Sequence, residues 1–198
     1  MGIPFEQRNF QKELDKKIAG FQKDGIVPTL LLHSCCAPCS SHCIEYLSDY
    51  FHITVFYYNP NISAEEEYRK RVEEQKRFIS EFPAKYKVSF IEGDYDTKEF
   101  YDIAKGYERC FRCYELRLRK TCETAKAGGF DYFTTTLTIS PLKNSVRLNE
   151  IGLKLSEEYD MPYLLSDFKK KEGYKRSIEL SHEYNLYRQN YCGCVYSR

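Results

Sequence analysis

Residues 29–39 read TLLLHSCCAPC, a short apolar run that follows Pro28 and leads into three cysteines. An apolar run of this length, bounded by a proline and a polar turn, is typical of a buried β-strand. Cys35, Cys36 and Cys39 then lie on the loop that leaves the carboxyl end of that strand. The residues best suited to chemistry therefore begin where the first predicted strand ends.

Strand and helix patterns alternate along the rest of the chain. Further strands are predicted at residues 52–58, 87–92, 132–139 and 162–165. Helices are predicted at residues 40–50, 63–82, 100–105, 110–127, 146–159 and 177–190. Ser63 and Glu66 have the spacing of a capping box at the start of the second of these helices. The alternation implies right-handed crossovers and a mostly parallel sheet with helices on both faces.

This pattern predicts a single α/β domain. The chain has 198 residues, which suits one well-buried domain and is too short for two of ordinary size. We assign the domain to residues 28–198 and treat residues 1–27 as an N-terminal extension. Ligands of such folds bind beyond the carboxyl ends of the strands, where the strand order reverses. The loops that follow the strands are therefore the predicted rim of the active site.

The charge balance gives no reason to expect a nucleic acid or a membrane from the whole molecule. There are 30 Lys and Arg against 29 Asp and Glu, a formal net charge of +1. The first residues mix acids, bases and amides where a signal peptide needs an apolar stretch, and no later run would span a bilayer. We therefore expect a cytoplasmic protein without a membrane partner, in which any site for a polyanion is a local patch.

Nine cysteines in such a chain indicate metal binding or redox chemistry, because a reducing cytosol does not keep structural disulfides. Three groups stand out, which are Cys35-Cys36-Ala37-Pro38-Cys39, Cys110-Phe111-Arg112-Cys113 and Cys192-Gly193-Cys194. Cysteine pairs on separate loops fit either a four-cysteine zinc site or an iron–sulfur cluster. The adjacent Cys35 and Cys36 favour a cluster, because neighbouring side chains diverge in an extended chain and suit tetrahedral zinc poorly.

Other cysteines allow more than one interpretation. Cys39 is either a small buried side chain or a functional residue, whereas Cys43 and Cys122 are expected to be buried and inert. A disulfide between Cys192 and Cys194 would be strained and easily reduced, which suits a redox switch or an electron store. The flexible glycine between these two thiols would equally allow them to wrap a metal ion.

Four motifs in this order resemble the QueH-type epoxyqueuosine reductases. They are HSCCAPC at residues 33–39, ERCFRCY at 108–114 with Arg117-Leu118, TTTL at 134–137 with Ser140-Pro141, and YCGC at 191–194. The resemblance runs from about Leu30 to the C-terminus. It implies a two-electron deoxygenation of epoxyqueuosine at the wobble position of tRNA, the last step of queuosine biosynthesis, with a 4Fe–4S cluster and without cobalamin.

The resemblance also implies a fold similar to the HUP and PP-loop group of ATP pyrophosphatases. The phosphate-binding Ser-Gly-Gly-x-Asp-Ser loop of that group is missing, and residues 33–39 occupy its place, so ATP use is not expected. The pairing of cysteines on two loops, together with the family pattern, assigns the cluster ligands. They are Cys35, Cys36, Cys110 and Cys113. The family motif ends at Cys192 and Cys194, to which we assign a redox role close to the cluster.

Removing an epoxide oxygen requires two electrons and an acid that receives the oxygen. If four cysteines ligate all four irons, no iron is open and a second acid is needed. The candidates are a second metal ion, iron or zinc, held by Cys192, Cys194 or a strand-end carboxylate, or a protonated side chain at that strand end. The strand-end carboxylates are Asp94 and Asp96.

An anticodon loop offers unstacked bases, so a modest basic surface suffices to bind it. The predicted contacts to tRNA phosphates are Lys169, Lys170, Lys171, Lys175 and Arg176, which follow the fifth predicted strand. A second basic run lies beside the Cys110 motif, and either run is equally explained as a solvated face.

The electron donor is not identified by the sequence. Two other functions stay open: a zinc-stapled RNA-binding protein without catalysis, and a cluster-dependent tRNA thiolase.

Overall fold

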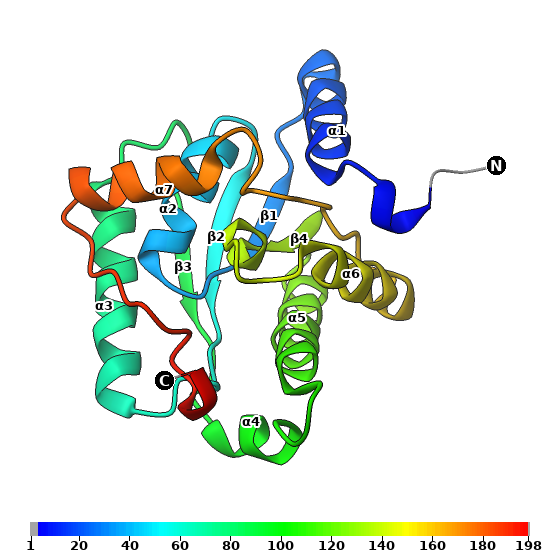
Figure 1. The fold of residues 1–198 in the computed structure, drawn as a ribbon. Helices are drawn as coiled ribbons and strands as arrows, with labels where there is room; N and C mark the ends of the chain where they lie inside the picture. Colours follow the sequence, from blue (N-terminus) through cyan, green and yellow to red (C-terminus); the bar gives the residue numbers. More distant parts are fainter. Residues whose placement is uncertain (1–3, 198) are drawn as a thin grey trace.

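A four-stranded, all-parallel sheet forms the centre of the protein (Figure 1). The computed structural model of the chain describes residues 4–197. The strands are β1 (Thr29–His33), β2 (His52–Tyr57), β3 (Ser89–Glu92) and β4 (Tyr132–Thr135), in the order β3-β2-β1-β4. The parallel α/β fold expected from the sequence is confirmed.

Seven α-helices connect and cover the strands within residues 4–197. They are α1 (Phe10–Asp24), α2 (Ala37–Leu47), α3 (Glu65–Glu81), α4 (Thr97–Ile103), α5 (Arg109–Ala127), α6 (Ser145–Tyr159) and α7 (Gly173–Glu183). Short 3-10 turns are η1 (Phe5–Gln7), η2 (Thr136–Ile139) and η3 (Val195–Ser197). None of the helices in the described part of the chain combines the length and apolarity needed to cross a membrane.

Both faces of the central strand β1 are buried, because successive side chains of a strand point to opposite faces. Leu30 and Leu32 pack into a core with residues of α1, α2 and α3. Leu31 points the other way and packs with Phe133 and with residues of α5 and α6. This double burial explains why β1 is a continuous apolar run rather than an alternating one.

The winding of the chain reverses between β1 and β4. From β1 the chain passes through α2 to β2 and through α3 to β3, moving toward one edge of the sheet. It then returns through α4 and α5 to β4, on the other side of β1. The loops that leave β1 and β4 consequently diverge to opposite faces, and a crevice opens between them.

Three local predictions were wrong. The strand predicted at 132–139 ends at Thr135, whose hydroxyl accepts a hydrogen bond from the Leu137 amide (3.1 Å) and caps η2. The strand predicted at 162–165 is only an isolated bridge between Phe133 and Tyr163. The capping box is absent, because Ala64 is the N-cap of α3 and the Ser63 hydroxyl accepts from the Val195 amide instead.

The last helix also differs from the prediction, which placed it at 177–190. α7 ends at Glu183, and Asn185 follows in the left-handed region with φ 47°. A residue in that conformation commonly ends a helix. The residues beyond Asn185 then cross the molecule toward the carboxyl ends of the strands, where the C-terminal cysteines lie (Figure 1).

The segment assigned as an N-terminal extension is mostly α1, which packs against the domain. Leu14 and Ile18 join the same core as Leu30. On the polar side of the helix, the Asp15 carboxylate accepts from the Tyr46 hydroxyl (2.6 Å) and pairs with Lys171 Nζ (2.6 Å). α1 is thus attached by apolar packing and by ionic contacts.

Gly152→Ala is expected to destabilise the protein by about 1–3 kcal/mol, the usual cost of overpacking. A Cβ atom at this position of α6 would lie 2.4 Å from the buried ring of Tyr163. The matched control is Gly20→Ala in α1, where no atom lies within 4 Å of the added Cβ. Gly20→Ala should stabilise by about 0.5–1 kcal/mol through helix propensity. Urea unfolding of both variants measures the difference, and equal effects would contradict the packing described for α6.

Candidate metal centre and redox site

A pocket of about 670 Å³ lies at the point where the winding reverses, and seven of the nine cysteines line it. These are Cys35, Cys36, Cys39, Cys110, Cys113, Cys192 and Cys194. All three predicted groups, which are far apart in the sequence, therefore meet in one cavity. Cys43 and Cys122 are fully buried in the two apolar cores.

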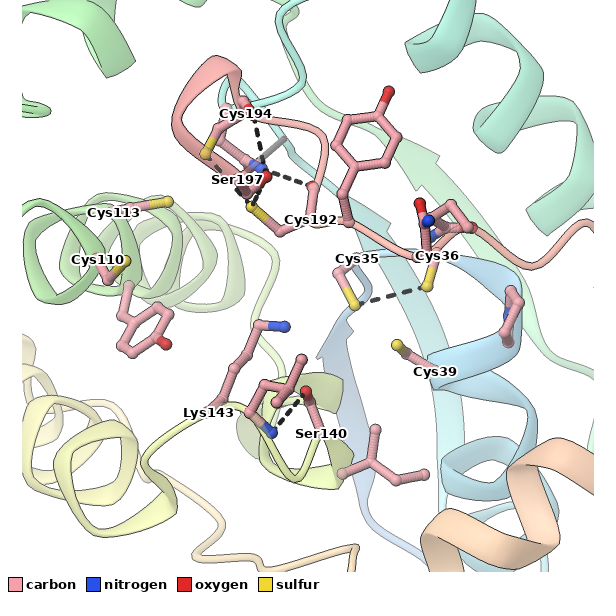
Figure 2. A pocket seen from close by; sticks show the side chains of 18 of the residues that line it. Cys35, Cys36, Cys39, Cys110, Cys113, Ser140, Lys143, Cys192, Cys194 and Ser197 are labelled. Carbon is pink, nitrogen blue, oxygen red and sulfur yellow. Dashed lines mark hydrogen bonds between the residues drawn. The ribbon is translucent and has the colours of Figure 1, made fainter.

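The first group brings three sulfur atoms together (Figure 2). The Sγ atoms of Cys35, Cys36 and Cys39 all lie within 4.8 Å of one another, and those of Cys35 and Cys36 are 3.8 Å apart. Cys36 is the N-cap of α2, and Cys39 lies in the first turn of that helix. The change from strand to helix turns the chain enough for all three thiols to converge. Cys39, whose role the sequence left open, is thus part of the thiol group.

The three thiols differ in acidity because they hydrogen-bond to one another. Hydrogen bonds from Cys36 and Cys39 hold the pKa of Cys35 well below its usual value, with a further contribution from Lys143 and Arg117. The hydrogen bond to Cys35 raises the pKa of Cys36 to about 12, and the hydrogen bonds to Cys35 and Cys36 raise the pKa of Cys39 well above its usual range. Convergent cysteine sulfurs suit zinc or iron, and a bound metal would take all three as thiolates. This group could hold a metal.

Cys110 and Cys113 lie across the pocket in the first turns of α5 (Figure 2). Residues three apart on a helix face the same side, so the C-x-x-C spacing directs both thiols toward the cavity. Cys110 is exposed and Cys113 is buried. The side chain of Lys143 reaches into the space between this pair and the Cys35 group. The two groups of predicted cluster ligands therefore face each other over a common cavity.

Cys192 and Cys194 lie beside Cys113, in a small apolar cluster with Phe100. Their Sγ atoms are 3.4 Å apart as free thiols. The hydrogen bond between the two thiols lowers the pKa of Cys192 to about 5 and raises the pKa of Cys194. A low-pKa thiolate next to a protonated thiol is the arrangement found in reactive dithiol pairs.

Hydrogen bonds to the backbone hold the C-terminal segment in the pocket. The Cys192 carbonyl accepts from Asn61 Nδ2 (3.1 Å) and from Arg71 Nη1 (3.3 Å). The Ser63 amide donates to the Gly193 carbonyl (3.1 Å). These anchors could not be predicted from the sequence, because polar residues before and within a helix give no signal that their partners lie about 130 positions away in the chain.

Asp94 and Asp96 are not among the residues that line the pocket. Asp96 is the N-cap of α4 and accepts a hydrogen bond from the Lys98 amide (2.9 Å). The Asp94 side chain is exposed, and its carboxylate lies 4.0 Å from Lys120 Nζ. The catalytic role assigned to these carboxylates stays a prediction that no contact in the site supports.

The basic run after residue 168 is largely neutralised within the protein. Lys169 pairs with Asp167 (2.7 Å), Lys171 with Asp15 (2.6 Å) and Arg176 with Glu45 (2.6 Å). Lys175 lies 3.6 Å from Glu172, and Lys170 is exposed. The cations that line the pocket are instead Arg71, Arg109, Arg117, Lys143 and Arg188. The role of the run in tRNA binding stays a prediction.

A parallel α/β domain with thiols from three segments gathered at its switch point is typical of a cysteine-dependent oxidoreductase or metal centre. The comparison with known families identifies the particular family within this class. The family model described as "Epoxyqueuosine reductase QueH" matches residues 30–198. The chain therefore belongs to the epoxyqueuosine reductase QueH family, as its motifs had indicated, and is an oxidoreductase of queuosine biosynthesis.

Relatives that carry this name match nearly the whole chain. The chain is 42% identical over 203 residues to epoxyqueuosine reductase QueH of Streptococcus pyogenes serotype M1, covering 98% of the chain and 80% of the relative. It is 42% identical over 200 residues to the protein of the same name from Staphylococcus epidermidis, covering 96% and 84%. The Staphylococcus aureus protein of that name is 40% identical, with 96% and 83% covered.

Gly193→Ala is expected to release the C-terminal thiols from the pocket. Gly193 has φ +102°, and an added Cβ would lie 2.8 Å from Ile62 Cγ1. Backbone strain of this kind costs on the order of 1–3 kcal/mol, so the segment should lift and Cys192 should react faster with a thiol reagent. Gly129→Ala is the control, since it has φ +66° but no atom within 4 Å. An unchanged thiol reactivity in Gly193→Ala would contradict the close packing of this segment.

Proposed function

We propose that the protein reduces epoxyqueuosine to queuosine in the wobble position of tRNA, using a 4Fe–4S cluster held by Cys35, Cys36, Cys110 and Cys113. The observation that carries the proposal is the convergence of three cysteine groups in one pocket of a chain that belongs to this family. An electron donor from outside the protein would supply the reducing equivalents.

The donor set of the pocket fits a thiolate-bound cluster. The pocket offers sulfur ligands from opposite sides, and no histidine lines it among residues 4–197. Cysteine thiolates are the usual ligands of iron–sulfur clusters, and such a cluster supplies electrons one at a time. Cys39 lies within 4.8 Å of both Cys35 and Cys36 at the sulfur atoms. It is therefore the first residue to consider as a replacement ligand, or as a ligand of a second iron or zinc ion.

Lys143 is the proton donor that the pocket offers to the leaving oxygen. Burial lowers the pKa of this ammonium group, but Cys35 and Cys39 outweigh that effect and raise it above the usual value. Lys143 therefore stays protonated at neutral pH and can donate a hydrogen bond, and then a proton, to the epoxide oxygen. Lys143 is thus a candidate for the acid beside those predicted from the sequence, which are a second metal ion and a protonated side chain at Asp94 or Asp96.

Cys192 and Cys194 supply electrons in a pair. Oxidation of two thiols to a disulfide releases two electrons and two protons, and an epoxide that takes up both becomes an alkene and water. The sulfur atoms are already 3.4 Å apart, so the disulfide forms with little movement. The disulfide would return to the dithiol by taking up two electrons and two protons, with the electrons coming from the outside donor. A cluster held by Cys35, Cys36, Cys110 and Cys113 would supply single-electron transfer between the two.

Aromatic side chains at the rim of the pocket are suited to unstacked bases. Tyr174 and Tyr196 line the pocket and are partly exposed. Arg188 lies over the Tyr174 ring at 5.5 Å, and Arg109 lies over the Tyr196 ring at 5.1 Å. Aromatic rings and arginine planes stack bases of single-stranded RNA, while the cations contact phosphates. These features support an anticodon loop as the ligand of this face.

Cys110→Ala is expected to lose the cluster. Purified without air, the wild type should contain iron and sulfide and absorb broadly in the visible range, whereas the variant should lack both signals and reductase activity. Cys122→Ala is the control, because Cys122 is fully buried away from the pocket and should leave the metal content unchanged. A full complement of iron and sulfide in Cys110→Ala would show the ligand assignment to be wrong. Zinc alone in the wild type would instead favour the zinc-stapled RNA-binding protein without catalysis.

The double variant C192A/C194A should keep the iron, the sulfide and the visible spectrum but lose epoxyqueuosine reduction, because its cluster ligands are intact. Nucleoside analysis of treated tRNA measures the activity. Trapping of free thiols after a single turnover of the wild type should show two fewer thiols if the pair is the electron store, and no change if it holds a second metal. Full activity of the double variant would exclude both roles.

A further inference from the structure

Arg117 is a charged side chain buried under the pocket. It extends from α5, is only 2% exposed, and points toward the carboxyl ends of β1 and β2. Its Nε–H donates to His33 Nε2 (3.3 Å), and its Nη2 donates to Asn59 Oδ1 (2.5 Å). Both partners are neutral groups.

Arg117 differs from the other buried arginine, Arg71, in having no acid beside it. Arg71 is also 2% exposed, but its guanidinium lies 2.6 Å from the Glu67 carboxylate. Arg117 forms no ion pair with a carboxylate among residues 4–197, and its hydrogen bonds go to His33 and Asn59. A buried charge without a partner is strongly unfavourable, so an anion close by is needed to offset it.

The groups near Arg117 that can become anions are the cysteine thiols that line the same pocket. Burial works to lower the pKa of Arg117, yet the thiols of Cys113, Cys35 and Cys192 raise it above its usual value. Each of these three belongs to a different cysteine group of the pocket. Arg117 thus lines the cavity at the point where the three cysteine groups converge.

The surrounding hydrogen bonds fix the guanidinium in place. Because Arg117 always donates, its hydrogen bond to His33 requires the tautomer in which Nδ1 carries the proton and donates to Thr135 Oγ1 (2.8 Å). In this tautomer the Tyr58 carbonyl, 3.2 Å from Nε2, receives no hydrogen bond from the ring. Asn59 in turn donates from Nδ2 to the Ser34 carbonyl (2.9 Å). The guanidinium is therefore anchored to β1, to the loop after β2 and, through His33, to β4.

We propose that Arg117 is a positioning residue that provides the fixed counter-charge of the thiolate-bound cluster and thereby raises its reduction potential. Reduction of a cluster adds one negative charge. A buried positive charge nearby stabilises the reduced form more than the oxidised form, and net charge and burial are known determinants of cluster potential. The proposal rests on the proposed function, because it requires that the pocket holds a cluster.

The test compares midpoint potentials of reconstituted proteins by anaerobic spectroscopic titration. Arg117→Gln removes the charge but retains an amide that can donate a hydrogen bond, while Arg117→Lys retains the charge. We expect Arg117→Gln to lower the equilibrium constant for one-electron reduction by about tenfold, which is about 59 mV toward negative potential. Arg117→Lys should stay close to the wild type.

A second variant neutralises Arg117 without removing it. Asn59→Asp places a carboxylate where the amide oxygen now accepts from Arg117, so the potential should again move to negative values. The control is Arg119→Gln on the same helix, because Arg119 is partly exposed and paired with Glu115 and Glu158. It should leave the potential unchanged.

The outcomes separate this proposal from the function on which it rests. If the wild type takes up no iron and sulfide, the proposed function and the role of Arg117 both fail. If the wild type carries a cluster but Arg117→Gln and Asn59→Asp keep its potential, only the role of Arg117 is overturned. If Arg117→Gln does not bind a cluster, Asn59→Asp decides the question: its carboxylate lies against the guanidinium, so an unchanged potential would show that charge at this position does not reach the cluster and would overturn the proposal.

Discussion

The reversal of winding between β1 and β4 is the constraint on which the site depends. The two strands are hydrogen-bonded neighbours, yet the chain leaves β1 toward α2 and leaves β4 toward α6, on opposite faces of the sheet. Parallel strands end at the same edge, so this divergence leaves a space that neither helix fills. The cysteine loop after β1, the start of α5 and the C-terminal segment all border that space.

Electrostatics explains why the space is suited to sulfur chemistry. A thiolate is stable in a buried site only beside positive charge or hydrogen-bond donors, and the pocket supplies Lys143 from one side and Arg117 from beneath. The same cations are stabilised by the thiols, since burial alone would lower the pKa of both. Thiols and counter-charges are thus mutually dependent, and removing either leaves the other in an unfavourable environment.

The sequence predicted the fold and the cysteine groups well, because their signals are local. The apolar run of β1 and the C-x-x-C spacing need no knowledge of distant residues. The contacts of Asp96 could not be predicted in this way, since a carboxylate after a strand serves equally as a helix cap. Lys143 was missed for a similar reason: one lysine in a loop carries no pattern, and only the fold places it between two cysteine groups. Short elements also failed, as at residues 162–165, where a single bridge replaces a strand.

The spacing of the cysteines along the chain has a consequence for biogenesis. Cys35, Cys36 and Cys39 leave the ribosome long before Cys110 and Cys113, and a complete centre needs α5 to have folded against β1. During synthesis the three early thiols are already close enough in sequence to bind an available metal ion by themselves. A centre with the proposed ligands from both groups could therefore be completed only after α5 has folded, and a zinc ion captured earlier by the first three thiols would have to be exchanged.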